Sequence, residues 1–287
     1  MNAYSDVASL ESAVRQAAAE TDITDIHTHL FPPSHGDLLL WGVDELLTYH
    51  YLVAELFTVA PRDLTPDRFW ALSKAEQADL VWEHVFLRHG ALSEAARGAV
   101  TTLNRLGLDV AGRDLKAIRA WFAAQTVEDY LAKVFELAGL DYAVMTNNPF
   151  VPEEVAHWQA NRPGLDCLRT ALRIDPLLVD WPRAAKAMAE MGYTVEPQAD
   201  EKSFEAARQF MTDWTGRLQP MYMAASLPPD FHYPAKGTTA RVMRRVILPV
   251  ARDLGLPMAM MTGVRKGVNP ALGDGGDAVG VADVTAV

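Results

Sequence analysis

The sequence has one cysteine, no long apolar run and fewer basic than acidic residues. These shortages argue against a disulfide, a membrane-spanning helix and a nucleic-acid partner. Because Cys167 has no second cysteine as a partner, an intrachain disulfide and a cysteine-based zinc cage are both excluded. No apolar stretch approaches the roughly 20 residues that a membrane-spanning helix needs. The N-terminal segment also lacks the basic start and apolar centre of a secretion signal. We therefore expect a soluble, cytoplasmic protein with no membrane partner.

The balance of charge argues against a nucleic-acid partner. The chain carries 26 lysines and arginines against 37 acidic residues, which gives a formal net charge of −11. A field of that sign repels the phosphate backbone of DNA or RNA. The share of hydrophobic residues, 49%, is that of an ordinary globular protein. The composition is that of a globular chain of enzyme size.

The first half of the sequence has mostly helical periodicity. Residues 5–20 read as a helix, and "DITDI" after them has the alternation of a strand. From about residue 37 to residue 139, apolar residues recur at spacings of three and four. Within this stretch, four residues stand where helix N-caps are expected, namely Thr65, Ser93, Asp114 and Thr126. The spacing predicts an all-helical block that is too long to be a loop.

After residue 140, strands and helices alternate. The segments "DYAVMTNN", "LRTALRIDP", "QPMYMAASLPPDF" and "LPMAMMTGV" read as strands, and amphipathic helices lie between them. Strands that are apolar on both faces and alternate with helices indicate a parallel sheet covered by helices. We predict three regions: a helix and first strand over 1–36, a helical insertion over 37–139, and further βα units over 140–287.

Polar side chains collect where the predicted strands end, at His27, His29, Asn147, Asn148, Arg173, Ser226 and Arg265. In a parallel barrel, the carboxyl ends of the strands form the active face. His27 and His29 lie two residues apart on one strand, so both side chains project to the same side. Two neutral imidazoles so placed can bind one divalent ion. The alternative is that each histidine is simply hydrogen-bonded; burying both without a partner, however, would be costly.

At this point the residues resemble a known family. "TDIHTHL" at the start of a βα series is similar to the first strand of the amidohydrolase superfamily, which carries a His-x-His metal pair. The long helical insertion, the segment "LLTYHYLVAELF", the strand "LRTALRIDP" and the loop "GVRKGVNPALGDGGDAVG" resemble one branch, the uronate isomerases. The resemblance covers residues 21–283 in order. It implies a (β/α)8 TIM barrel of the metal-dependent hydrolase type, in the α/β class, with a large helical insertion after strand 1.

The resemblance also implies an activity and roles for particular residues. The reaction would be aldose–ketose isomerisation of a hexuronate, either D-glucuronate to D-fructuronate or D-galacturonate to D-tagaturonate. His27 and His29 would hold a divalent metal, with zinc expected, and Arg173 would bind the sugar carboxylate. From the residues alone, the alternative for Arg173 is a salt bridge to Asp175 or a helix-dipole contact. His50 and Tyr51 would be catalytic, although their helical apolar pattern by itself indicates core residues. Arg265 would be a second substrate-binding residue. We also expect a homo-oligomer.

Several positions depart from the family pattern. Asn147 and Asn148 replace an acidic pair, Leu227-Pro228 stand where the fourth strand normally ends in Asp-His, and Met261 replaces a histidine. Only about five βα units are present, and no residue matches the aspartate of the last barrel strand. Asp274, Asp277 and Asp283 fall in the loop after the fifth strand. The sequence therefore reads as a truncated fragment, or as a chain that borrows its missing strands.

Two other functions remain open from the sequence. One is a metal-dependent hydrolase or decarboxylase of the same superfamily, although the absence of a strand-tip lysine favours the isomerase. The other is a catalytically degenerate barrel that binds a sugar acid. The motif "GDGGD" is only loosely similar to a phosphate or calcium loop, because it lacks the P-loop lysine and the alternating ligands of an EF-hand.

Overall fold

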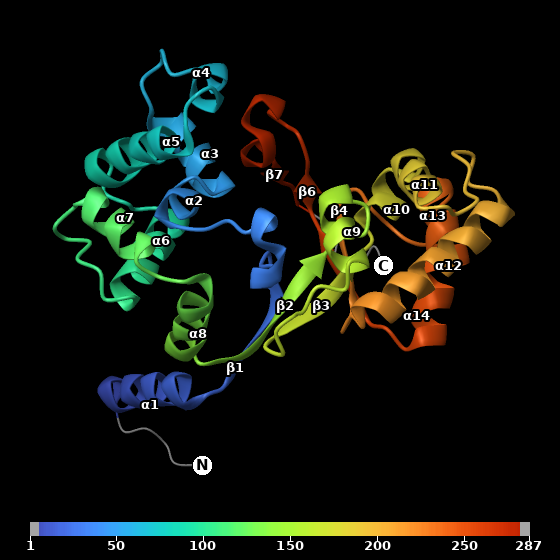
Figure 1. Cartoon of the computed structure of the whole chain (residues 1–287), viewed down its shortest axis with the longest axis horizontal. Coiled ribbons are helices and arrows are strands. Elements are labelled where there is room, and N and C mark those ends of the chain that lie inside the picture. The colour runs from blue at the N-terminus through green and yellow to red at the C-terminus, as the bar shows by residue number, and fades with distance from the viewer. Residues whose placement is uncertain (1–5, 282–287) are drawn as a thin grey trace.

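The computed structural model describes residues 6–281. Its centre is a curled sheet of five parallel strands, with helices packed against it (Figure 1). The strands follow one another in space in chain order: β1 Ile23–Thr28, β2 Leu140–Asn147, β3 Leu168–Arg173, β4 Met223–Leu227 and β5 Met258–Thr262. A second, two-stranded antiparallel sheet contains β6 Val264–Arg265 and β7 Ala278–Val279. All four strands predicted after residue 140 are confirmed.

Sequential parallel strands joined by helices are the arrangement of a (β/α)8 barrel, and residues 6–281 contain five such strands. β2 with β3 and β4 with β5 pair in continuous register, as in the run from Met223 opposite Met258 to Leu227 opposite Thr262, whereas the pairing of β1 with β2 has register shifts. β1 and β5 are the two outer strands of the described sheet. The predicted fold class, a partial barrel with a helical insertion after strand 1, is confirmed.

The helices begin largely where the sequence places caps. Side chains of Thr65, Ser93, Asp114 and Thr126 each accept a hydrogen bond from the backbone N–H three residues later. Each cap satisfies one of the N–H groups that the first helical turn leaves without a partner. The first described helix starts at residue 7, after a cap at Asp6. Residue 5, where the sequence pattern places the start of this helix, lies outside the described residues.

Between β1 and β2 the chain is helical. The elements are η1 Pro33–Leu38, α2 Val43–Leu47, α3 His50–Val59, α4 Pro66–Trp70, α5 Lys74–Val81, η2 Trp82–Arg88, α6 Glu94–Arg105, α7 Leu115–Ala123 and α8 Val127–Ala138. Leu47, Val53, Phe69, Leu103 and Ile118 are fully or almost fully buried in a hydrophobic core shared by α2–α7. Figure 1 shows these helices on the opposite side of the sheet from α11–α14. The division at residues 37–139 stays a prediction.

The second group of helices covers the outer face of β3 and β4. It consists of α9 Pro152–Gln159, α10 Asp175–Val179, α11 Trp181–Glu190, α12 Glu201–Leu218, α13 Thr238–Val242, η3 Met243–Ile247 and α14 Leu248–Leu254. Leu172 and Met223 from the strands pack with Phe204 and Phe210 of α12 and with Val246 of η3, all fully buried. Each such side chain contributes about 1.5–3 kcal/mol on burial. This core holds the ends of β3 and β4 in place.

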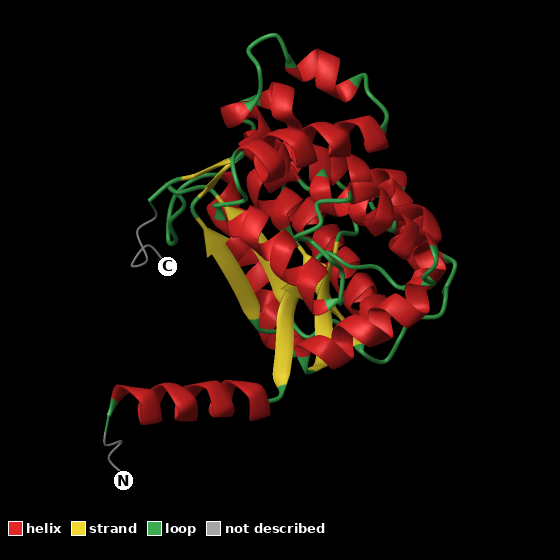
Figure 2. Ribbon diagram, turned by 90° about the vertical axis from the view of Figure 1, so that its left-hand side faces the viewer, coloured by secondary structure: helices red, strands yellow, loops and turns green. Residues whose placement is uncertain are grey.

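The helix α1 Val7–Glu20 lies apart from the rest of the molecule (Figure 2). None of its side chains is buried, and Val7, Leu10 and Val14 are exposed. No described helix has the length and apolar character to cross a membrane.

Candidate active site

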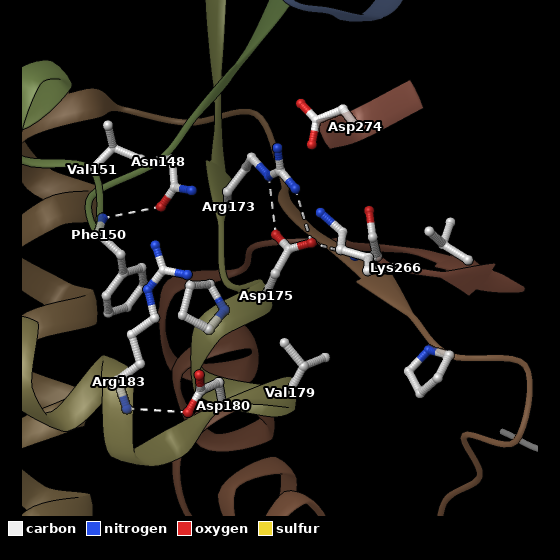
Figure 3. Close-up of a pocket in the computed structure, with 14 residues that line it drawn as sticks. Asn148, Phe150, Val151, Arg173, Asp175, Val179, Asp180, Arg183, Lys266 and Asp274 are labelled. Atoms are coloured by element: carbon white, nitrogen blue, oxygen red, sulfur yellow. Dashed lines mark hydrogen bonds and ion pairs between the residues drawn. The ribbon is translucent and has the colours of Figure 1, made fainter. Parts of the chain in front are cut away.

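A cavity of about 640 Å³ opens at the carboxyl ends of the strands (Figure 3). Its polar lining comes from four places in the chain: the turn after β2, the end of β3 with the two helices that follow it, the end of β4, and the loop after β5. The charged residues around it are Arg173, Asp175, Asp180, Arg183, Lys266 and Asp274. The sequence placed polar residues at these strand ends, and the structure gathers several of them around one hollow.

Arg173, the last residue of β3, forms a two-pronged ion pair with Asp175. Its Nε and Nη2 donate to Oδ2 and Oδ1 of Asp175, both at 3.0 Å. Asp175 Oδ1 also accepts a hydrogen bond from the backbone N–H of Ser226 at 2.7 Å. Burial works to raise the pKa of Asp175, but the hydrogen bonds and charge of Arg173 outweigh it, so the net pKa is lowered. One edge of the guanidinium is therefore occupied, and Nη1 makes no hydrogen bond with any residue in 6–281.

His27 and His29 lie side by side at the end of β1. Their ring centroids are 5.2 Å apart, and the ring planes are nearly perpendicular. Partial burial, followed by the charge of Arg173, lowers the pKa of His27. Partial burial also lowers the pKa of His29, with further contributions from His27 and Arg173. Both imidazoles are consequently neutral at pH 7, which is the form that binds a metal.

The ring of His29 is oriented by β2. Thr146 Oγ1 donates to the carbonyl of Thr28 at 3.2 Å and lies 3.2 Å from His29 Nδ1. Because the hydroxyl proton is used on that carbonyl, the network assigns the imidazole proton to Nδ1, which donates to Thr146. The lone pair of His29 then sits on Nε2. Sequence reasoning missed Thr146, which reads as an ordinary β-branched strand residue.

His50 and Tyr51 begin α3. The His50 ring lies among aromatic neighbours, with its centroid 4.3 Å from Tyr49 and 4.1 Å from Tyr51. Burial lowers the pKa of His50, while Asp274 and Asp277 act in the opposite direction. The Tyr51 side chain is 60% exposed. Its neighbour Tyr49, not singled out from the sequence, lines a second hollow of about 380 Å³ together with His27 and His29.

Arg265 lies away from the main cavity. It is exposed on β6, beside Gly280, whereas the preceding Val264 and the following Lys266 line the cavity. The Lys266 ammonium group forms no ion pair with a residue of the described chain. Successive strand residues point to opposite sides, so if Val264 faces the cavity, Arg265 faces away from it and Lys266 faces it again. The sequence does not show which of these two faces lies toward the cavity, and Lys266 was therefore missed.

The Asn147-Asn148 turn is built on a buried carboxyl group. The backbone N–H of Asn148 donates to Glu154 Oε2 at 3.0 Å, and Trp158 Nε1 donates to Glu154 Oε1 at 3.1 Å. Burial raises the pKa of Glu154 despite these hydrogen bonds. Asn148 Oδ1 in turn accepts from the N–H of Phe150, which closes the turn. Glu154 was overlooked because it lies in an ordinary amphipathic helix pattern.

The replaced family positions bring apolar groups to the strand ends. Pro228 lines the main cavity, and Leu227 before it is fully buried in the helix-facing core. Met260 packs against that core, so Met261 points to the other face of β5 and is partly exposed there.

The described residues supply two ligands of the type that a divalent ion takes. Residues 6–281 contain no group of three or more histidine, cysteine, aspartate or glutamate side chains positioned to hold a metal. The two neutral imidazoles nonetheless suit a divalent transition-metal ion such as zinc. In His29 the proton is held on Nδ1 by Thr146, which leaves Nε2 free to bind the ion. His27 and His29 therefore fit a divalent ion as part of its coordination shell.

Comparison with known proteins places this geometry in a family. A scan against family models gives no match, and a search of curated proteins gives none. Among solved structures, a uronate isomerase from Bacillus halodurans is similar over 100% of this chain and 67% of its own, with 43% identity and a TM-score of 0.93. The chain belongs to the uronate isomerase family.

Two more distant structures share the fold. A glucuronate isomerase from Caulobacter crescentus matches 98% of this chain and 68% of its own, with 18% identity and a TM-score of 0.71. A uronate isomerase from Thermotoga maritima matches 94% of this chain and 67% of its own, with 14% identity and a TM-score of 0.70. The uronate isomerase resemblance drawn from the residues is thus confirmed, and the chain spans about two thirds of the length of each match.

Proposed function

We propose that this uronate isomerase family member interconverts the aldose and ketose forms of a hexuronate, D-glucuronate or D-galacturonate. The observation that carries the proposal is the placement of a neutral histidine pair and an arginine at one end of the sheet. That placement occurs in a chain 43% identical to a uronate isomerase along its whole length. A hexuronate has a carbonyl at one end and a carboxylate at the other, and the site offers a partner for each.

His27 and His29 would hold a divalent ion at the carbonyl end. When bound, such an ion polarises the carbonyl oxygen and stabilises negative charge that develops on it. Support comes from the lowered pKa of both rings and from the hydrogen bond between His29 Nδ1 and Thr146. Zinc as the ion, a cytoplasmic location and a homo-oligomer remain predictions.

Arg173 would bind the carboxylate at the other end of the substrate. Asp175 occupies its Nε and Nη2 and so fixes the guanidinium plane, and Arg173 lines the main cavity. A guanidinium presents donors in a fixed fork that a lysine cannot reproduce. Arg265 would contribute only at longer range, since it lies outside the cavity lining.

Proton transfer would involve His50 and Tyr51. In the isomerisation a base removes the proton from C2, and a proton is delivered to C1 through an enediolate. The O2 proton is lost as the ketone forms, and O1 gains one. His50 is suited to the first role because burial keeps its imidazole neutral at pH 7. A phenol such as that of Tyr51 can donate to one oxygen while accepting from another.

The test is a uronate isomerisation assay with matched metal analysis. Purified protein is loaded with divalent metal and incubated with D-glucuronate or D-galacturonate, and the ketose is detected by ¹³C NMR. We expect ketose formation, and we expect His27→Ala and His29→Ala to lose metal and turnover while remaining folded. His89→Ala, at an exposed histidine, is the control and should keep both.

The role of Arg173 is tested separately. Arg173→Lys should weaken binding of the uronate at least tenfold more than binding of the corresponding neutral sugar. Hydrolysis of esters or amides without uronate turnover would replace the isomerase with a hydrolase. Equal losses for the acid and the neutral sugar would show that Arg173 does not bind the carboxylate.

A further inference from the structure

The loop after β5 holds a carboxylate that the proposed reaction does not yet use. This loop carries the "GDGGD" motif and connects β6 to β7 through the short helix η4 Pro270–Gly276. Asp274 lies on it and lines the main cavity, facing Arg173 across the hollow in Figure 3. Sequence reasoning set Asp274 aside because it does not match the aspartate of the last barrel strand.

Contacts with the helical insertion fix the position of the loop. Trp70 Nε1 of α4 donates to the carbonyl of Ala271 at 2.8 Å. Gly275 lies against the first turn of α3, where a Cβ atom would be only 2.9 Å from the His50 carbonyl oxygen. At Gly276, a Cβ would fall 1.8 Å from the carbonyl oxygen of Asn269. The glycines on the C-terminal side of Asp274 are therefore required by close backbone approach, and they bring the carboxylate over the site.

Asp274 lies near both parts of the proposed substrate site. It lines the main cavity together with Arg173 (Figure 3). At the histidine end, its charge partly opposes the lowering of the pKa of His29 and His50 by burial. A six-carbon chain with its carbonyl at the histidines and its carboxylate at Arg173 would therefore bring its middle carbons near Asp274.

No group within residues 6–281 donates a hydrogen bond to the Asp274 carboxylate, and none forms an ion pair with it. It differs in this from Asp175 and Asp277, which are both held by backbone N–H groups. An ionised carboxylate only accepts hydrogen bonds, so it pairs with a ligand that supplies O–H or N–H groups. The hydroxyl groups along a sugar chain are such donors.

We propose that Asp274 is a substrate-binding and specificity residue that accepts hydrogen bonds from the middle hydroxyl groups of the hexuronate. The proposal rests on the uronate function and extends it, because it assigns the discrimination between C4 epimers to the loop after β5. Carbonyl and carboxylate recognition remain with the histidines and Arg173.

The experiment compares ligands with and without hydroxyl groups. Binding of D-glucuronate, D-galacturonate and adipate is measured by calorimetry for the wild type, Asp274→Asn and Asp253→Asn. Adipate has six carbons and a carboxylate at each end, and it has no hydroxyl group. Asp253→Asn is the matched control, since it removes the same charge from an exposed residue of α14, at the opposite end of β5.

We expect Asp274→Asn to weaken D-glucuronate binding about tenfold or more, the usual effect of losing hydrogen bonds to a charged group. Adipate binding should stay the same or strengthen, and the ratio of the two C4 epimers should change. Gly275→Ala should show the same selective loss, because its Cβ displaces the loop from α3. Asp253→Asn should behave like the wild type.

Two failures can be told apart. If the wild type binds D-glucuronate and Asp274→Asn binds it equally well, or loses both acids equally, the role of Asp274 is refuted and the uronate function stands. If the wild type binds neither uronate, the uronate function is refuted and the role of Asp274 with it.

Discussion

His35 provides a pH-dependent contribution to folding that can be measured directly. The residue lies in η1, just after the first strand, and its side chain is 0% exposed. Its ring stacks on that of His157 of α9 at 4.5 Å, and Trp158 packs edge-on at 5.0 Å. The titratable and charged groups around it are Asp37 on its own element, and His157 and Arg162 on the segment packed against it.

The hydrogen-bond network fixes the neutral form of His35. Ser34 Oγ donates to the carbonyl of Pro163 at 2.6 Å, so the contact of 3.1 Å to His35 Nδ1 requires the imidazole proton on Nδ1. Nε2 has no hydrogen-bond partner in the described part of the chain. Protonation would place a charge and an unpaired N–H at a buried nitrogen. Burial first, and then His157 and Arg162, lower the pKa of His35 from 6.5 to about 4.

The sign and size of the effect follow from that pKa. Between pH 6.5 and about pH 4 the unfolded chain binds a proton at this residue and the folded chain does not. Stability therefore has its full value above pH 6.5 and falls as the pH decreases through this range. The gap corresponds to about 3 kcal/mol in total, since each pKa unit is worth about 1.4 kcal/mol. Most of it, about 2.5 kcal/mol, is lost between pH 7 and pH 4.5.

The assay is urea unfolding followed by tryptophan fluorescence at pH 7 and pH 4.5. Other histidines with lowered pKa also contribute to the pH dependence, so the comparison is between variants. His35→Gln should lose about 2.5 kcal/mol less than the wild type over this range, because glutamine does not titrate. His232→Gln, at an exposed histidine, should retain the wild-type dependence. Equal losses in the wild type and His35→Gln would refute the reasoning.

Two further predictions concern residues that orient the site. Thr146→Val removes the oxygen that accepts from His29 Nδ1, so divalent-metal affinity measured by calorimetry should fall at least tenfold, whereas Thr146→Ser should retain it; a valine variant with wild-type affinity would contradict the orienting role. Asp175→Asn removes the carboxylate charge beside Arg173 and should lower the free energy of unfolding by about 2 kcal/mol at pH 7. Urea unfolding measures this, and an unchanged midpoint would show that the ion pair does not stabilise the fold.

Local patterns in the sequence were sufficient for the elements of the fold. Helix caps such as Ser93 and Asp114 depend on residues three positions apart, and the alternation of apolar strands with amphipathic helices depends on short periodicities. The side-by-side placement of His27 and His29 follows from the two-residue repeat of a strand. The strand-end position of Arg173 follows from the same kind of pattern.

The environment of these side chains depends on how turns and distant segments fold around them. Whether Arg173 binds only a ligand or also Asp175, two residues later, depends on the turn into α10, which brings Asp175 onto one edge of the guanidinium. The presence of Lys266, and not Arg265, in the cavity lining depends on the register of the β6–β7 hairpin. Neither is encoded in a spacing that a reader of the sequence can measure.

The sequence by itself therefore determined the α/β barrel class, the helical insertion, the histidine pair and the family, because each follows from short local patterns and from their order along the chain. Only the tertiary structure decided that Thr146 orients His29 and that a glycine-rich loop brings Asp274 to the main cavity. Those contacts join elements far apart in the chain. They form only when parallel strands align their carboxyl ends and the insertion packs against the loop after β5.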